Sequence, residues 1–173
     1  MPCDIMSRKS QGFTLIELVA GIVVFGFAIL LMTTLLFPQA KRAGSALHEV
    51  RAAELAHSLL NEINSKKFDE NTPTGGVPAC GSSSPGALAC SDTMGPDSEG
   101  RGDYDDVDDF NGLNENSDMN SSGEKYQDYY ENYRLSVSVA YANPPAKAQK
   151  IVSVTVTTPG GTELKFNSVR SNF

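Results

Sequence analysis

Glu17 is a single carboxylate inside a long apolar run that extends from Phe13 to Phe37. A run of about 25 residues is long enough as a helix to cross a bilayer. A lone carboxylate in such a segment is costly to desolvate, so it needs a partner of opposite charge and indicates a functional site. We therefore predict a paired Glu17. The alternative is that this carboxylate lies at the depth of the lipid headgroups, near the start of the helix.

Five aspartates crowd one short segment of the chain: Asp103, Asp105, Asp106, Asp108 and Asp109. Their mutual repulsion keeps the segment extended unless a cation or backbone donors bind it. Oxygen ligands at this density suit a hard cation, so one prediction is a calcium site formed by the five, although their spacing does not match an EF-hand loop. The other predictions are a solvated loop whose aspartates cap turns, and a loop anchored by Val107 and Phe110. No other cofactor is expected.

Two cysteines, Cys80 and Cys90, lie in a loop rich in glycine, serine, proline and alanine, with no histidine nearby to complete a zinc site. In an oxidising compartment, two cysteines about ten residues apart predict a disulfide. A redox-active or metal-binding pair is the alternative. Cys3 lies ahead of the apolar run, in the N-terminal segment.

The composition narrows the class of protein. The chain has 173 residues and a formal net charge of −7, and an acidic chain without a basic patch argues against nucleic-acid binding. The sequence contains no Gly-x-Ser-x-Gly, no His-Glu-x-x-His and no phosphate-binding loop, so it does not predict an enzyme. The part that follows the apolar run is long enough for one small domain.

Beyond the apolar run, the residue pattern predicts that the helix continues. An apolar stripe at helical spacing favours an amphipathic stalk helix over 38–66, which joins the transmembrane segment 13–37 in one helix. The stripe comprises Leu47, Val50, Leu55, Leu59, Leu60 and Ile63.

A loop-rich region and three strands are predicted for the remainder. Glycine, serine, proline, asparagine and aspartate dominate 67–132. Alternating apolar residues predict strands at 134–141, 150–157 and 162–169. Pro159-Gly160-Gly161 predicts the turn between the last two. The fold class is therefore α+β, with a long N-terminal helix whose outer part packs on a small C-terminal antiparallel sheet at 133–173.

The segment Gln11-Gly12-Phe13-Thr14-Leu15-Ile16-Glu17-Leu18 resembles the processing site of type IV prepilins and type II secretion pseudopilins. An ordinary secretory signal is cleaved after its apolar region, whereas here the small residue precedes it. The resemblance implies a leader over 1–12, cleavage after Gly12 by a prepilin peptidase, and methylation of the new amine of Phe13. It also implies that Glu17 pairs with the N-terminal amine of a neighbouring subunit. Met1 and Met6 both remain open as the start of the leader.

The same resemblance implies a pilin-like architecture and a location. The protein is expected to cross the inner membrane once, with its C-terminal region in the periplasm, or outside the cell in an assembled pilus. Arg8 and Lys9 agree with this orientation, because basic residues stay cytoplasmic. The implied partners are the prepilin peptidase, the major and other minor pilins, the inner-membrane assembly platform and the membrane itself.

Further segments are similar to minor pilin-like proteins of the mannose-sensitive haemagglutinin (MSHA) pilus cluster. They are residues 37–40, 50–63, 68–71 and the acidic run 104–112. The expected function is therefore that of a minor pilin, which joins or primes a filament. One alternative is a type II secretion pseudopilin. Another is a signal-anchored periplasmic module that binds its target with calcium.

Overall fold

The computed structural model describes residues 12–120 and 122–173, and for residues 37–43 it describes the backbone alone. The chain forms two compact units, Met1–Gly44 and Ser45–Phe173. Of the leader expected over 1–12, the described residues include only Gly12.

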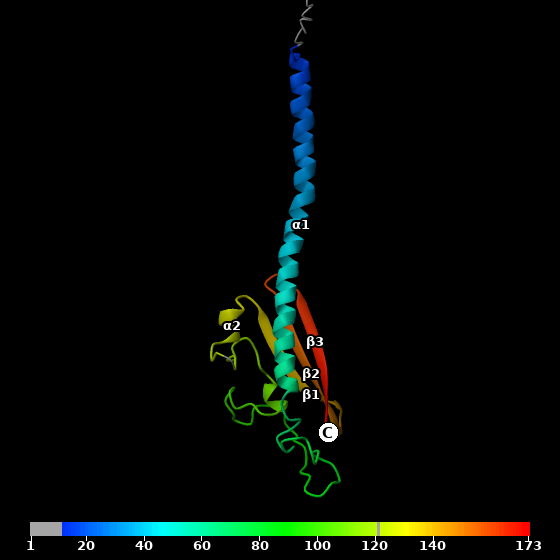
Figure 1. The fold of residues 1–173 in the computed structure, drawn as a ribbon, viewed down its shortest axis with the longest axis vertical. Coiled ribbons are helices and arrows are strands. Elements are labelled where there is room, and N and C mark those ends of the chain that lie inside the picture. Colours follow the sequence, from blue (N-terminus) through cyan, green and yellow to red (C-terminus); the bar gives the residue numbers. More distant parts are fainter. Residues whose placement is uncertain (1–11, 121) are drawn as a thin grey trace, which may run out of the picture. The chain divides into compact units, whose positions relative to one another are not determined.

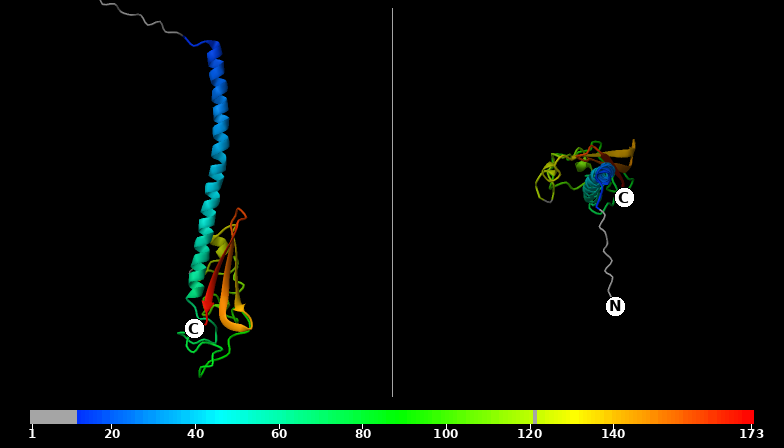
Figure 2. Two further views of the ribbon diagram at one scale, coloured as in Figure 1. Left: turned by 90° about the vertical axis from the view of Figure 1, so that its right-hand side faces the viewer. Right: turned by 90° about the horizontal axis from the view of Figure 1, so that it is seen from above.

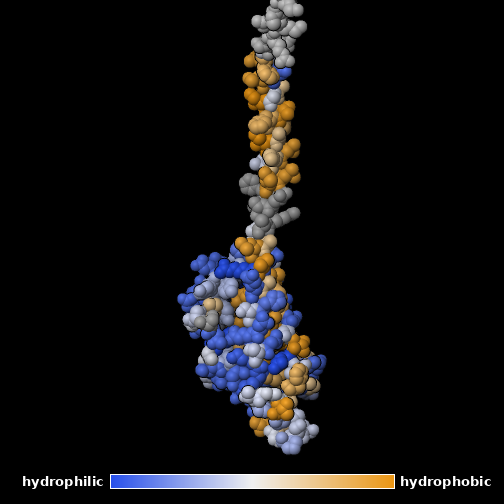
Figure 3. All heavy atoms as spheres, viewed as in Figure 1, coloured by the Kyte–Doolittle hydropathy of each residue, from blue (hydrophilic) through white to orange (hydrophobic). Residues whose placement is uncertain are grey.

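A single helix, α1 (Leu15–Asn64), begins in the first unit (Figure 1). Thr14 precedes it, and the Thr14 carbonyl accepts the N–H groups of Glu17 and Leu18 at 3.1 and 3.2 Å. Within α1, Leu15–Leu36 has a mean hydropathy of 2.7 and is long and apolar enough to cross a membrane. None of this span is buried, and its apolar side chains cover the face seen in Figure 3, as in a helix whose surface meets lipid or other apolar helices. This span agrees with the predicted segment 13–37 to within two residues at each end.

The second unit contains a three-stranded antiparallel sheet in the order β1-β2-β3. The strands are β1 (Arg134–Asn143), β2 (Ala146–Thr157) and β3 (Glu163–Ser171). Gly161, at a φ of +83°, closes the turn between β2 and β3, where its N–H donates to the Thr158 carbonyl. The predicted meander and its turn are confirmed, although β2 begins four residues earlier than the alternation indicated.

The core lies between one face of the sheet and residues 45–64 of α1, which run alongside the strands in both views (Figures 1 and 2). The helix contributes Ala52, Leu55, Ala56, Leu59, Leu60 and Ile63. Alternate residues of the strands complete the core: Leu135, Val137, Val139, Val152, Val154 and Val156. Such a face matches the period of two that makes one side of a strand apolar.

The predicted helix stripe is wrong at its first two members. Leu47 and Val50 are 69% and 56% exposed. Leu47 lies one helical turn before Arg51, and Val50 lies one turn before Glu54. Arg51 and Glu54 are exposed, so Leu47 and Val50 share the solvent-facing side of the helix. The residue on the sheet side of this turn is His48, whose Nδ1 lies 2.7 Å from the hydroxyl oxygen of Tyr133.

Residues 65–132 run largely without regular structure but are tied down at several points. They contain a short 3-10 helix, η1 (Asp108–Phe110), and one turn of helix, α2 (Tyr126–Tyr129). Val107 and Phe110 are fully buried in the core, so the prediction that they anchor the acidic loop is confirmed.

Candidate functional site

The N-terminal residues that the motif singles out lie together at the start of α1. Phe13 and Glu17, four positions apart, line one shallow apolar groove with Leu18, Gly21, Ile22 and Phe25. Nothing lies within 4 Å of the place that a side chain on Gly21 would occupy, so the groove is open beside the Glu17 carboxylate. Thr14 Oγ1 accepts the N–H of Glu17 at 3.4 Å, which is the helix-capping geometry of a threonine three residues before a glutamate.

The N-terminal end of α1 favours the negative charge of the Glu17 carboxylate. Its carboxylate stands in the first turn of α1, where unpaired backbone N–H groups carry partial positive charge. Cleavage after Gly12 would create an amine four residues away along the chain. Among residues 12–36, the structure shows no ion pair to Glu17. The assembly role of this carboxylate remains a prediction.

The predicted disulfide between Cys80 and Cys90 is present, with a Cα–Cα distance of 4.9 Å. Both cysteines are buried against Phe68 and Tyr141. Asn172 donates to the Cys80 carbonyl at 2.9 Å, so the bridge also fastens the C-terminal end of the chain. The carboxylate of Asp69 and the two sulfur atoms lie within 4.8 Å of one another, but the sulfur atoms are bonded to each other and are not free thiolates for a metal.

Loss of this disulfide is expected to destabilise the Ser45–Phe173 unit. Closing a loop of this length contributes about 2–3 kcal/mol on the chain-entropy estimate, so Cys80→Ser with Cys90→Ser should lower the free energy of unfolding by that amount. Urea denaturation of the detergent-solubilised chain measures it. The control is the wild-type chain with reductant added, which should approach the variant. Equal stability in all three samples would contradict a stabilising bridge.

The acidic segment is folded inward and does not form one ligand set. Asp106, Asp108 and Asp109 are buried, whereas Asp103 and Asp105 are exposed. Asp106 Oδ1 accepts the N–H groups of Asp108 and Asp109 at 2.6 and 3.2 Å. Asp109 Oδ2 accepts those of Asp105 and Asp106 at 2.9 and 3.0 Å. Turn capping by aspartates is thus confirmed, and the prediction of a solvated loop is wrong for the three buried ones.

Burial changes the protonation of two of these carboxyls. Burial, together with the neighbouring Asp108 and Asp109 carboxylates, raises the pKa of Asp106 to about 7. Burial also raises the pKa of Asp108, to about 6, against the opposing effect of the Lys150 ammonium. These two groups therefore titrate near neutral pH instead of near their ordinary value.

Sequence reasoning missed Lys150, a charged residue that is completely buried beside the acidic segment. Its Nζ lies 2.6 Å from Asp108 Oδ1 and 3.1 Å from Asp69 Oδ2, and it donates to the Phe68 carbonyl at 2.6 Å. The Phe68 ring is 4.3 Å and the Tyr141 ring 5.3 Å from the same nitrogen. The alternation of β2 carried the signal, since Lys150 shares its parity with the inward-facing valines 152, 154 and 156.

Asp69 holds the end of the cysteine loop against this lysine. It accepts the N–H groups of Asn71 and Ser91 at 3.1 and 3.0 Å. Burial alone would raise the pKa of Asp69, but the Lys150 ammonium and these backbone donors outweigh burial and lower it. Lys150, Asp69 and Asp108 therefore join three separate segments: β2, the loop that follows α1, and the acidic loop.

Calcium binding by the acidic segment remains a prediction. Among the described residues, the carboxylates of Glu99, Asp105 and Asp109 come within 4.8 Å of one another. Asp103 is not in this group, Asp108 is paired with Lys150, and Asp105 also pairs with Lys67 at 2.8 Å. The five aspartates are therefore not brought together as a single site.

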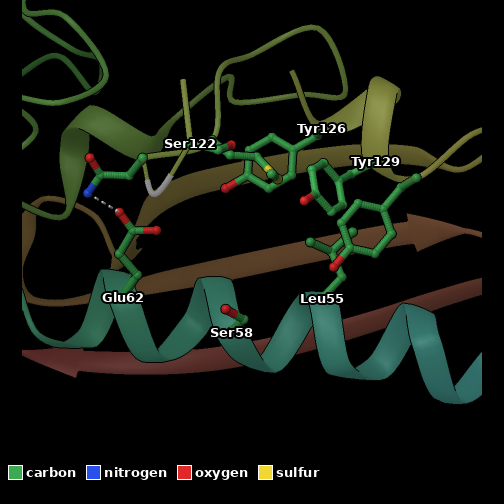
Figure 4. A pocket seen from close by; sticks show the side chains of 9 residues that line it. Leu55, Ser58, Glu62, Ser122, Tyr126 and Tyr129 are labelled. Carbon is green, nitrogen blue, oxygen red and sulfur yellow. Dashed lines mark hydrogen bonds between the residues drawn. The ribbon is translucent and has the colours of Figure 1, made fainter. Parts of the chain in front are cut away.

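A hollow between α1 and residues 119–130 is lined mainly by aromatic and polar side chains (Figure 4). Its lining comprises Leu55, Ser58, Glu62, Met119, Asn120, Ser122, Tyr126, Tyr129 and Tyr130. Glu62 accepts from Asn120 Nδ2 at 3.2 Å and pairs with Arg101 at 2.8 Å. Its carboxylate is thus already engaged by these two side chains.

Comparison with known families identifies the N-terminal segment. Residues 7–33 match the family model of the prokaryotic N-terminal methylation motif, and this match includes Gly12, Phe13 and Glu17. No curated protein matches the chain, and no solved structure does. The chain thus carries a prepilin-type methylation motif, and its fold is a pilin-like α+β arrangement of an N-terminal apolar helix and a small C-terminal antiparallel sheet.

Proposed function

We propose that the chain is a type IV pilin-like subunit that a prepilin peptidase cleaves after Gly12 and methylates at Phe13. The carrying observation is the methylation motif at residues 7–33, which runs directly into an apolar helix. In this proposal the mature protein is held in the inner membrane by Leu15–Leu36, with the Ser45–Phe173 unit in the periplasm. It then leaves the membrane to join or prime a filament of homologous subunits, through an assembly platform in that membrane.

In this proposal, Glu17 directs the assembly of subunits into the filament. The carboxylate and the N-terminal amine of a neighbouring subunit attract strongly in a medium of low dielectric, while each alone would be costly to desolvate. The pair forms only when two subunits meet in register, so it selects the correct stagger during assembly. The open groove beside Gly21 leaves room for a neighbour to approach Glu17.

The mass of the N-terminus tests the proposal. The membrane-purified protein is analysed by intact and N-terminal mass spectrometry, from cells with and without the prepilin peptidase. The proposal expects a chain that starts at methylated Phe13 only where the peptidase is present. An intact leader in peptidase-competent cells would contradict it, and Leu15–Leu36 would then be a plain anchor.

Substituting Glu17 is expected to separate processing from assembly. Glu17→Ala should leave cleavage largely intact and lower incorporation into sheared filaments by about tenfold or more, since each 1.4 kcal/mol of lost pairing is tenfold. The control is Glu54→Ala, which removes an exposed glutamate of α1 in the second unit. Normal incorporation of the Glu17→Ala variant into filaments would contradict the proposed pairing of Glu17 with a neighbouring amine.

Within this class, we propose a minor pilin of an MSHA-type pilus. This narrower proposal rests on a resemblance of residues 37–40, 50–63, 68–71 and 104–112 to MSHA minor pilin-like proteins. A type II secretion pseudopilin shares the same motif and is the alternative. Deleting the assembly platform of each system in turn separates the two, because the subunit is recovered outside the cell only while its own platform is present.

A calcium-dependent binding module is the second candidate, favoured by the grouping of Glu99, Asp105 and Asp109. Calcium ligands are carboxylate and carbonyl oxygens, and the periplasm and medium supply the ion. Titrating calcium into the detergent-solubilised chain tests this function. A rise in melting temperature that Asp105→Asn abolishes would support a site there, and an unchanged melting temperature would count against it.

A further inference from the structure

The ion pairs that Lys150 forms are unusual because the lysine and both of its carboxylate partners are buried. Lys150 and Asp69 have no exposed surface, and Asp108 is 2% exposed. In the other ion pairs that residues 12–120 and 122–173 form, at least one partner reaches solvent. Two carboxylates thus face one ammonium in a part of the core from which water is excluded.

This arrangement leaves charge and hydrogen bonding unbalanced. One positive charge does not neutralise two negative ones, and a buried ion pair regains the cost of desolvation only where every remaining polar atom has a partner. Asp108 Oδ2 has none and is fully buried. Condensation of the ammonium with this carboxylate would remove both charges of the pair and one of the two carboxylate oxygens, which leaves the core with a neutral amide.

We propose that Lys150 and Asp108 are joined by an intramolecular amide bond, with Asp69 as the proton carrier. The ammonium first passes a proton to the Asp108 carboxylate, and the free Nζ attacks Cγ to give a tetrahedral centre. The Asp69 carboxylate takes a proton from nitrogen and returns it to a Cγ hydroxyl, which leaves as water while the carbonyl reforms. One N–C bond forms, one C–O bond breaks, one water is released, and Asp69 ends as it began.

The positions of the three groups fit these roles. A separation of 2.6 Å between Nζ and Asp108 Oδ1 holds the nucleophile against the carboxyl that it attacks. Asp69 Oδ2, 3.1 Å from the same nitrogen, lies within the range for direct proton transfer. The Phe68 and Tyr141 rings flank Nζ and limit the access of the water that would reverse the reaction. The product amide keeps one N–H, which can donate to Asp69 or to the Phe68 carbonyl.

Lys147 on the same strand shows what the site requires. Its Nζ also contacts a carboxylate, that of Asp92, but the Asp92 side chain is 93% exposed. Solvent therefore stabilises both charges there, and the pair has no reason to condense. The proposed bond would link β2 to η1, so it fastens the acidic loop to the sheet covalently, whereas the disulfide closes the loop between Cys80 and Cys90.

Mass spectrometry of the full-length chain tests the bond directly. After reduction and alkylation of the cysteines, the intact mass should be about 18 Da below that of the sequence, corrected for N-terminal processing. Trypsin should release a branched peptide in which residues 102–125 are joined to residues 148–165, because a modified Lys150 is not cut. The full sequence mass, with linear peptides that carry unmodified Asp108 and Lys150, overturns the proposal.

Two variants check the chemistry. Asp108→Asn should give the same cross-linked product by releasing ammonia, so its mass falls about 17 Da below its own sequence and equals that of the cross-linked wild type. Lys150→Arg keeps the charge but should show its full sequence mass. Asp69→Ala should lower the cross-linked fraction, and a fully cross-linked Asp69→Ala protein would remove Asp69 from the mechanism. A loss of water that persists in Lys150→Arg would assign the modification elsewhere and overturn the bond.

Discussion

Lys150→Met is expected to lower the free energy of unfolding of the Ser45–Phe173 unit by about 3–5 kcal/mol, the usual cost of removing one partner from a buried ion pair. The substitution keeps most of the side-chain volume but leaves Asp69 and Asp108 buried without a cation. It also removes the nitrogen of the proposed amide bond. The free energy of unfolding is therefore expected to fall whether Lys150 and Asp108 form an ion pair or an amide bond. Urea denaturation of the detergent-solubilised chain, followed by the near-ultraviolet signal of the tyrosines, measures the loss.

A lysine on the neighbouring strand provides the matched control for Lys150. Lys165 on β3 is exposed, so Lys165→Met should change the free energy of unfolding by less than about 0.5 kcal/mol. Adding Asp108→Asn to Lys150→Met should recover part of the lost stability, because it removes one of the two buried carboxylate charges that no longer have a cation. Equal losses for the two lysine variants would show that the buried carboxylates do not depend on Lys150.

The regular elements were predictable because their burial follows local periods. Leu135, Val137 and Val139 alternate along β1 as the sequence pattern indicated. The helix phase was harder, since the face that meets the sheet includes Ala52 and Ala56, small residues that a search for large apolar side chains passes over. Small side chains at these positions let the helix and the sheet approach closely, and the larger Leu47 and Val50 drew the predicted stripe to the wrong side.

The two candidate regions differ in how far sequence determines them. The N-terminal motif is local, because Gly12, Phe13 and Glu17 act through their order along one chain segment. The acidic loop is not local, because its turns decide which aspartates point inward. Asp69 joins Asp108 at Lys150 only through the fold, which brings the loop after α1 beside β2. Strand parity placed Lys150 inward, but the general rule that lysines are exposed favoured the opposite expectation.

The stability of the Ser45–Phe173 unit is expected to fall as the pH rises from about 5 to 8. The pKa of Asp106 is about 7 in the fold, against 3.8 as its ordinary value, so the native state binds more protons than the unfolded state in this range. Stability then decreases with pH, by about 4 kcal/mol for this one group over the whole interval between its two pKa values and by about 3 kcal/mol of that above pH 5, and the loss is complete above the folded pKa. Asp69 acts in the opposite direction, but only below its ordinary pKa, which is outside this range.

Asp106→Asn isolates the contribution of this carboxyl. The asparagine carbonyl can still accept the N–H groups of Asp108 and Asp109, so the turn is kept while the titration is lost. The variant should be more stable than wild type at pH 8 by about 2–4 kcal/mol and should show a shallower pH dependence. Asp103→Asn, at an exposed aspartate of the same segment, is the control and should retain the wild-type slope. An unchanged slope in Asp106→Asn would contradict the raised pKa.

The pH dependence of stability that remains in Asp106→Asn reports on the state of Asp108. Asp108, whose pKa is raised to about 6, is the other buried group that titrates in this range as a free carboxyl. A residual fall in stability centred near that pH therefore indicates the ion pair with Lys150. If Asp108 is instead bonded to Lys150, it has no proton to exchange, and the variant should be nearly independent of pH between about 5 and 8. The denaturation series thus gives a second measure of the Lys150–Asp108 bond, independent of mass.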